Sequence, residues 1–75
     1  MKVKEKLLSK KLEEAIGENS NGVVILINPK YYHKLASEKD IEDKLVVHDY
    51  SYHTFIGAPI LIDRGVDTWE IRERA

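Results

Sequence analysis

The chain has 75 residues, 12 basic and 13 acidic side chains, a formal net charge of −1 and no cysteine. This length predicts a single domain, residues 1–75, that buries only about 60% of its unfolded surface, so association with a second subunit would help its stability. The missing cysteine excludes disulfides and thiolate metal sites. The balanced charge excludes a general attraction to nucleic acid or anionic lipid.

Residues 2 to about 17 are predicted to form a helix, because apolar residues recur at the three- and four-residue spacing of one helical face. That face consists of Val3, Leu7, Leu8, Leu12, Ala15 and Ile16. The lysines crowded into the first eleven residues are expected to form its solvated face. Gly17 stands where a left-handed C-cap is expected. The absence of an aromatic residue from the apolar face favours a core-covering helix over a membrane-surface helix.

A loop at residues 18–22 separates this helix from the first predicted strand. Asn21 and Gly22 are expected to supply positive φ there at little cost. The strand, Val23–Ile27, is apolar throughout rather than alternating, which predicts burial on both faces near the centre of a sheet.

A second, short helix is predicted from about residue 29 to 42. Asn28 can cap it, and Pro29 suits its first position, where a missing N–H costs nothing. The charge-rich segment 38–44 is expected to be exposed.

Residues 44–55 predict extended structure, but neither face of one unbroken strand would be cleanly apolar. We therefore expect a turn or bulge near Asp49 to Ser51 that divides the segment into two short strands. Gly57 allows a tight bend before the next predicted strand, residues 58–62.

The last predicted strand, residues 68–74, follows a turn at 63–67 and alternates apolar and charged residues from Trp69 to Arg72. That alternation predicts a strand with one buried face at or near a sheet edge. The predicted fold class is therefore α+β: the N-terminal helix and the short second helix pack on a small, mostly antiparallel sheet of three to five strands.

No motif predicts chemistry, so we expect neither an enzyme nor a cofactor. His48 and His53 lie five residues apart in an extended segment, which is not a metal-ligand spacing, and no metal site is predicted. Ser51, His53 and Asp49 lie too close together on one strand to form a nucleophile-base-orienter chain. The glycines form no phosphate-cradling loop.

Aromatic residues are the predicted interaction residues, because tyrosine and tryptophan bury a large area while keeping a polar tip. They are Tyr31, Tyr32, Tyr50, Tyr52 and Trp69. Two alternatives stay open: some of them complete the core, or the tyrosines together with the N-terminal lysines bind nucleic acid. Acidic residues soon after Lys34 favour a protein partner or self-association over nucleic acid.

One pair of segments resembles part of a known family. The apolar strand Val23–Ile27 continues into Asn-Pro-Lys-Tyr-Tyr-His-Lys-Leu, residues 28–35, and residues 55–62 read Phe-Ile-Gly-Ala-Pro-Ile-Leu-Ile. This arrangement, covering roughly residues 22 to 63, resembles the axial domain of the major capsid proteins of tailed phages. The long spine helix, peripheral domain and extended loop of that family have no counterpart in this sequence.

The resemblance implies a phage or prophage origin and a capsid-like sub-fold, without shell formation. The predicted function is that of a non-enzymatic accessory protein that binds another protein, either a virion component or a host protein that it inhibits. The alternative is a small nucleic-acid-binding regulator. The predicted location is the cytoplasm by default, because no apolar stretch approaches the roughly 20 residues of a membrane span. The resemblance implies that this is the cytoplasm of a phage host, or else that the protein is associated with the virion.

Overall fold

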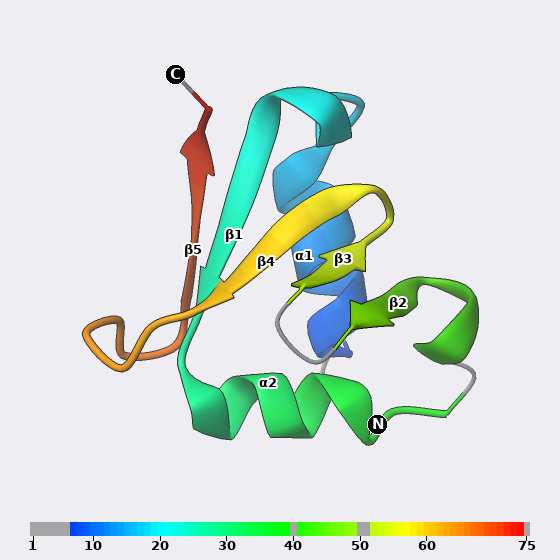
Figure 1. Ribbon diagram of the computed structural model, residues 1–75, viewed down its shortest axis with the longest axis vertical. Coiled ribbons are helices and arrows are strands. Elements are labelled where there is room, and N and C mark those ends of the chain that lie inside the picture. The colour runs from blue at the N-terminus through cyan, green and yellow to red at the C-terminus, as the bar shows by residue number, and fades with distance from the viewer. Residues whose placement is uncertain (1–6, 40, 50–51, 75) are drawn as a thin grey trace, which may run out of the picture.

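The computed structural model describes residues 7–39, 41–49 and 52–74, and shows two helices packed on one five-stranded sheet (Figure 1). The elements are α1 (Leu8–Ile16), β1 (Val23–Ile27), α2 (Pro29–Ala36), β2 (Leu45–Asp49), β3 (Tyr52–Phe55), β4 (Ala58–Ile62) and β5 (Trp69–Glu73). Short 3₁₀ turns occupy Ser20–Gly22 and Ile41–Asp43. The predicted α+β class is confirmed.

The sheet has the strand order β2-β3-β4-β1-β5. Three of its neighbouring pairs are antiparallel, as predicted, while β1 and β4 run parallel. Parallel neighbours need a long crossover, and here α2, β2 and β3 together form that connection. The sheet is therefore mixed, and β1 lies one strand from its edge rather than at its middle.

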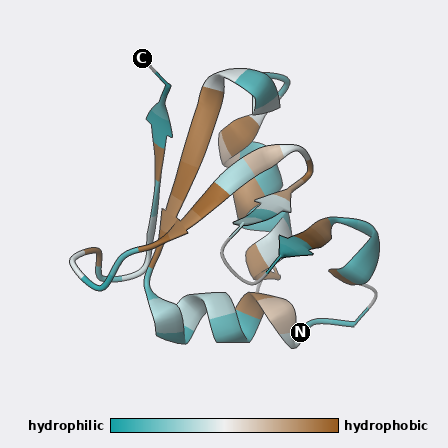
Figure 2. Ribbon diagram, viewed as in Figure 1, coloured by the Kyte–Doolittle hydropathy of each residue, from teal (hydrophilic) through white to brown (hydrophobic). Residues whose placement is uncertain are grey.

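The core lies between one face of the sheet and α1, which covers that face from behind in Figure 1. Ile25 and Ile27 of β1 are fully buried, and Figure 2 shows β1 as an apolar band along its whole length. The largest fully buried side chain is Phe55 of β3. Burial of β1 on both faces is confirmed except at Val24, which is half-buried.

The N-terminal helix begins at Leu8, because Leu7 has an extended backbone with ψ of 151°. The prediction that Leu7 is helical is wrong, and residues 2–6 lie outside the described residues. The buried face holds Leu8, Leu12 and Ile16, as predicted, but Leu7 and Ala15 are exposed and Ser9 is buried instead. The end of the helix is confirmed, since Gly17 has a φ of 62° and donates its N–H to the carbonyl of Glu13.

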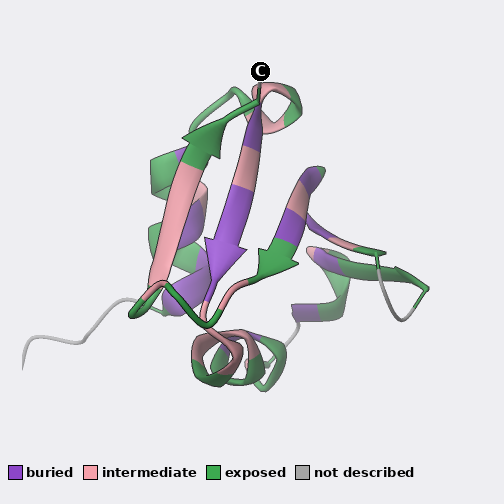
Figure 3. Ribbon diagram, turned by 60° about the vertical axis from the view of Figure 1, so that its left-hand side comes forward, coloured by how far each residue is buried: buried purple, intermediate pink, exposed green. Residues whose placement is uncertain are grey.

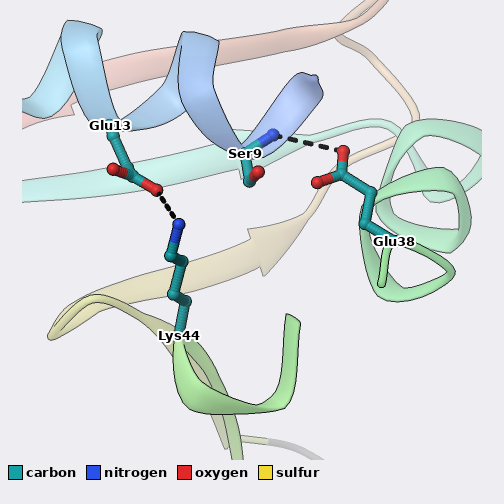
Figure 4. Close-up of polar contacts among 4 residues, drawn as sticks. All are labelled: Ser9, Glu13, Glu38 and Lys44. Atoms are coloured by element: carbon teal, nitrogen blue, oxygen red, sulfur yellow. Dashed lines mark hydrogen bonds and ion pairs between the residues drawn. The ribbon is translucent and has the colours of Figure 1, made fainter. Parts of the chain in front are cut away.

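Helix α1 has no side-chain cap of its own. The carboxylate of Glu38, just beyond α2, accepts a hydrogen bond of 3.2 Å from the N–H of Ser9 (Figure 4). A carboxylate at a helix N-terminus satisfies a free N–H group and interacts favourably with the helix dipole. The start of α1 is therefore set by a residue distant in sequence, which explains why a sequence pattern placed it too early.

Two further predictions between residues 18 and 43 need correction. Neither Asn21 nor Gly22 has a positive φ, because this loop closes in a 3₁₀ turn that needs none. The second helix ends at Ala36 rather than near residue 42, and Ile41–Asp43 forms a separate 3₁₀ turn. Burial of Ile41 against the core explains why this second turn forms on its own.

The extended segment 44–55 is divided as predicted. β2 and β3 pair as an antiparallel hairpin, with a register shift between Val47 and Asp49. A tight turn then joins β3 to β4, and both of its central residues have positive φ: 44° at Ile56 and 91° at Gly57. Positive φ at both positions is the property of a type I′ hairpin turn, so the predicted bend at Gly57 is confirmed.

Candidate interaction groove

A groove of about 530 Å³ lies where the start of α1, the outer side of α2 and the start of β5 meet. We call it the α1–α2–β5 groove. Its walls are formed by Leu7, Leu8, Lys11, Tyr31, Lys34, Glu38, Thr68 and Trp69. Two of the five predicted interaction residues, Tyr31 and Trp69, are thus brought together by the fold.

Asn28 positions both sides of this groove. Its side-chain oxygen accepts a hydrogen bond of 2.9 Å from the N–H of Lys30, which caps α2 as predicted. Its side-chain nitrogen donates a hydrogen bond of 2.9 Å to the carbonyl of Val66, in the loop that leads into β5. One amide side chain therefore fixes the helix that carries Tyr31 to the loop that precedes Trp69.

The loop between β4 and β5 is further held by its own bonds. The carboxylate of Asp63 accepts a hydrogen bond of 2.7 Å from the N–H of Gly65, and the N–H of Asp63 donates to the carbonyl of Ile27. The carbonyl of Thr68 accepts a hydrogen bond of 2.8 Å from the N–H of Asn28. These bonds place Thr68 and Trp69 against α2 and leave the groove preformed.

The lining of the groove includes Glu38, whose second carboxylate oxygen is buried and has no partner among the described residues. Its other oxygen is occupied by the N–H of Ser9. The two exposed lysines Lys11 and Lys34 stand at the rim, and the Lys34 ammonium lies 5.6 Å from the centre of the Tyr31 ring. The groove thus combines apolar and aromatic walls with two cations whose positions favour a negatively charged group.

Tyr32 lies on the same helix but has a different environment. Its hydroxyl forms a hydrogen bond of 2.5 Å with Nδ1 of His53. The two rings are tilted relative to each other, and their centres lie 5.3 Å apart. Burial raises the pKa of the Tyr32 hydroxyl. Tyr32 also packs against the core, as do Tyr31 and Trp69, so the alternative that some of these aromatics complete the core is confirmed in part.

The remaining predicted interaction residues lie away from the groove. Tyr52 is exposed at the start of β3 and stacks on His48, with ring centres 4.7 Å apart. Nε2 of His48 lies 3.1 Å from the Thr54 hydroxyl. Tyr50 lies outside the described residues.

The two histidines considered as metal ligands do not come together in the ranges that the structure describes. No group of three or more histidine, aspartate and glutamate side chains is placed to hold a metal ion among these residues. His48 contacts Thr54, whereas His53 contacts Tyr32, so the two histidines do not share a site. Ser51 lies outside the described residues.

Six of the eight groove residues are not among the five predicted interaction residues: Leu7, Leu8, Lys11, Lys34, Glu38 and Thr68. Leu7 belongs to the core face of the longer helix that the sequence predicts, and its observed position depends on where α1 begins. The contribution of Glu38 has no signal in the sequence, because it arises from a contact between residues 29 positions apart.

Comparisons with known proteins leave the chain without a match: no family model, no curated protein and no solved structure is similar to it. Within the described residues, neither helix has the length and apolar character needed to cross a membrane.

Proposed function

We propose that this chain is a non-enzymatic protein-binding module whose contact site is the α1–α2–β5 groove. The observation that carries the proposal is the meeting of Tyr31 and Trp69 beside the exposed Leu7, in a groove held open by backbone bonds. Aromatic side chains in preformed concave sites are the usual anchors of protein interfaces. Preformed walls also lower the entropy cost of binding.

The chemistry of the groove favours one class of partner: a peptide segment with an apolar anchor side chain flanked by aspartate or glutamate. The anchor would fill the space between Leu8, Tyr31 and Trp69. The flanking carboxylates would pair with Lys11 and Lys34 at the rim. Glu38 within the same groove would disfavour a second acidic group placed deep inside, so the negative charge belongs at the ends of the segment.

The test is selection from a displayed library of random peptides. We expect enrichment of sequences that carry a large apolar residue with acidic residues on either side. The double variant Lys11→Glu and Lys34→Glu should lose this enrichment, because both rim cations become anions. Enrichment of unrelated sequences, or none at all, would contradict the proposal.

A matched control has the same change in net charge. Lys10 and Lys30 are exposed on the same two helices but do not line the groove. The double variant Lys10→Glu and Lys30→Glu should therefore retain peptide selection. Equal losses in the two double variants would indicate a general charge effect and would remove the groove from the proposal.

Nucleic-acid binding remains the second candidate, because cations beside half-buried aromatic rings also suit stacked single-stranded bases. Only two lysines line the groove, and Glu38 lies beside them, which favours the peptide. Fluorescence polarisation with a labelled single-stranded oligonucleotide at about 50 mM salt separates the two, since phosphate contacts are strong at low salt. Binding that the groove variant loses would support this candidate.

The phage or prophage origin, with a virion component or an inhibited host protein as the partner, is part of the same proposal. It is supported by the capsid-like pair of segments in residues 22 to 63. Sequencing the genes that flank this one tests it directly. A neighbourhood without phage genes would remove the origin and leave the binding module unaffected.

A further inference from the structure

Strand β5 stands at the end of the sheet, and no strand among the described residues pairs with its outer backbone edge (Figure 1). It pairs with β1 in an uninterrupted register from Trp69, opposite Ile27, to Glu73, opposite Val23. An edge strand presents free N–H and C=O groups that can template another strand. The opposite edge, β2, is irregular, because its pairing shifts between Val47 and Asp49. A regular edge without a bulge is the better template.

The hydrogen bonds on the inner side of β5 identify which groups are free. The N–H of Arg74 donates to the carbonyl of Gly22, and the N–H of Asn28 donates to the carbonyl of Thr68, each at 2.8 Å. Hydrogen-bonded pairs alternate along an antiparallel ladder, so residues 70 and 72 also bond to β1. The backbone groups of residues 69, 71 and 73 therefore point outward, and no other described residue bonds to them.

We infer that two copies of this chain associate through antiparallel pairing of their β5 strands, with the two-fold axis at Ile71. In this register Ile71 faces Ile71 of the second copy, and Trp69 faces Glu73 of the second copy. The two-fold axis generates the Trp69–Glu73 pair twice, so there are three pairs with the one at Ile71. All three use the outward backbone groups, so each can form two hydrogen bonds. The two sheets would then join into one continuous sheet of ten strands, twice the five of one copy.

Glu70 and Arg72 lie on the face of β5 opposite to Ile71, and their charges select this register. Glu70 of one copy faces Arg72 of the other, and this happens twice because of the two-fold axis. These are non-hydrogen-bonded pairs, in which side chains come closest. Sliding the strands by two residues in either direction places Glu70 against Glu70 or Arg72 against Arg72. Like charges directly opposite are destabilising, so only the register centred on Ile71 is complementary.

The inner face of the same strands also gains from pairing. Ile71 and Trp69 are only half-buried, although both pack against the core. Facing Ile71 against its copy would cover apolar surface at the margin of the core. A five-residue strand nevertheless forms a small interface, which is typical of weak association. We therefore expect a dimer that is populated at high protein concentration.

The charge pattern supplies a decisive experiment by sedimentation velocity up to about 1 mM protein. The natural chain should approach the mass of two chains, against 8.7 kDa for one. Glu70→Arg places arginines opposite arginines, and Arg72→Glu places glutamates opposite glutamates, so each variant should remain monomeric. Mixing the two variants restores opposite charges at both positions and should restore the dimer as a heterodimer. Both side chains are substantially exposed, so each variant should fold.

Amide hydrogen exchange provides a second measurement that is specific to this edge. The amides of residues 69, 71 and 73 should become protected as concentration rises, whereas those of residues 70 and 72 should be protected throughout by β1. A natural chain that stays monomeric to about 1 mM would overturn the inference. So would a dimer that both charge variants retain, since its contact would then lie elsewhere, for instance at the α1–α2–β5 groove.

Discussion

Two strands of the sheet, the interior strand β1 and the edge strand β2, are built from similar residues but are buried very differently. In β1 four of the five residues are buried, whereas in β2 only Leu45 is buried and the rest of the strand is exposed. Figure 3 shows this contrast between the largely buried β1 and the largely exposed β2. Apolar, β-branched sequence thus predicts a strand in both places, but the position of each strand relative to α1 decides how much it stabilises the fold.

The contrast has a direct energetic meaning. Ile25 and Ile27 of β1 belong to the same core cluster as Leu12 of α1, and none of the three side chains is exposed. Val46 and Val47 of β2 are 43% and 57% exposed. Burial of apolar area is the main stabilising term, so the half of the sheet next to α1 should carry most of the free energy of unfolding.

Truncating one side chain in each region gives the largest expected difference. Ile25→Ala should lower the free energy of unfolding by about 3 kcal/mol, because it leaves a cavity in a fully buried site. Val47→Ala should change it by no more than about 0.5 kcal/mol. Urea denaturation followed by circular dichroism measures both. Similar losses of stability in the two variants would contradict the exposed position of Val47 in β2.

Asn28, which directly follows β1, allows a test of the contacts that join β1 to α2 and to the loop before β5. Asn28→Ala should cost about 1–2 kcal/mol, since it removes both the cap of α2 and the bond to the carbonyl of Val66. Asn28→Asp keeps the capping oxygen and loses only the donor, so it should cost about half as much. Asn21→Ala, at an exposed loop position, is the control. Equal effects of the alanine and aspartate variants would contradict a separate role for the donor.

Gly57 tests the turn that joins the outer hairpin to β4. Gly57→Ala should cost about 1 kcal/mol, because alanine is strained at a φ of 91°. The cost is conformational rather than steric, since an added Cβ would lie 3.5 Å from the Ser20 hydroxyl oxygen. Gly57→Asn should cost less, because asparagine tolerates positive φ better. Thermal unfolding of the two variants would rank them, and an asparagine variant less stable than alanine would contradict this account.

The smallest expected effect concerns the ion pair that ties the hairpin to α1. Lys44, before β2, pairs with Glu13 at 2.6 Å (Figure 4), and this hydrogen bond holds the pKa of Glu13 below its usual value of 4.5. Both side chains are about one-third exposed, so Glu13→Gln should cost only about 0.5 kcal/mol at neutral pH.

The pH dependence of this pair has a definite sign. A carboxylate with a lowered pKa in the folded state adds stability above its unfolded pKa and loses it as pH falls through the folded pKa. The difference between the natural chain and Glu13→Gln should therefore be full at pH 7 and shrink as the pH falls below 4.5. Chemical denaturation at several pH values measures it, and a difference that grows on acidification would contradict the pairing.

Much of the fold was determined by local sequence. The apolar segment Val23–Ile27, the Asn28-Pro29 helix start, the cap at Gly17 and the turn at Gly57 all correspond to observed structure. Their signals act over a few residues, through burial, capping and permitted backbone angles. The division of residues 44–55 into two strands followed from the same kind of local reasoning, because neither face of one strand would have been apolar.

The candidate site was only half predictable. Tyr31 and Trp69 stood out as aromatic residues, but nothing local placed them together, since this depends on the Asn28 side chain and the register of β5 beside β1. Tyr52 was proposed on the same grounds and lies elsewhere, stacked on His48. Residue type can mark a candidate anchor, whereas a groove exists only after distant segments have packed.

The sequence by itself thus determined which segments are strands and helices and which residues can bury surface. Tertiary structure alone decided that β1 and β4 run parallel, that Glu38 caps the start of α1, and that β5 stands at the edge of the described sheet. The physical reason is the sequence range over which each interaction acts. Propensity, capping by adjacent residues and alternation act between near neighbours. Sheet order, capping by a residue distant in sequence and grooves depend on contacts between residues that only the folded chain brings within bonding distance.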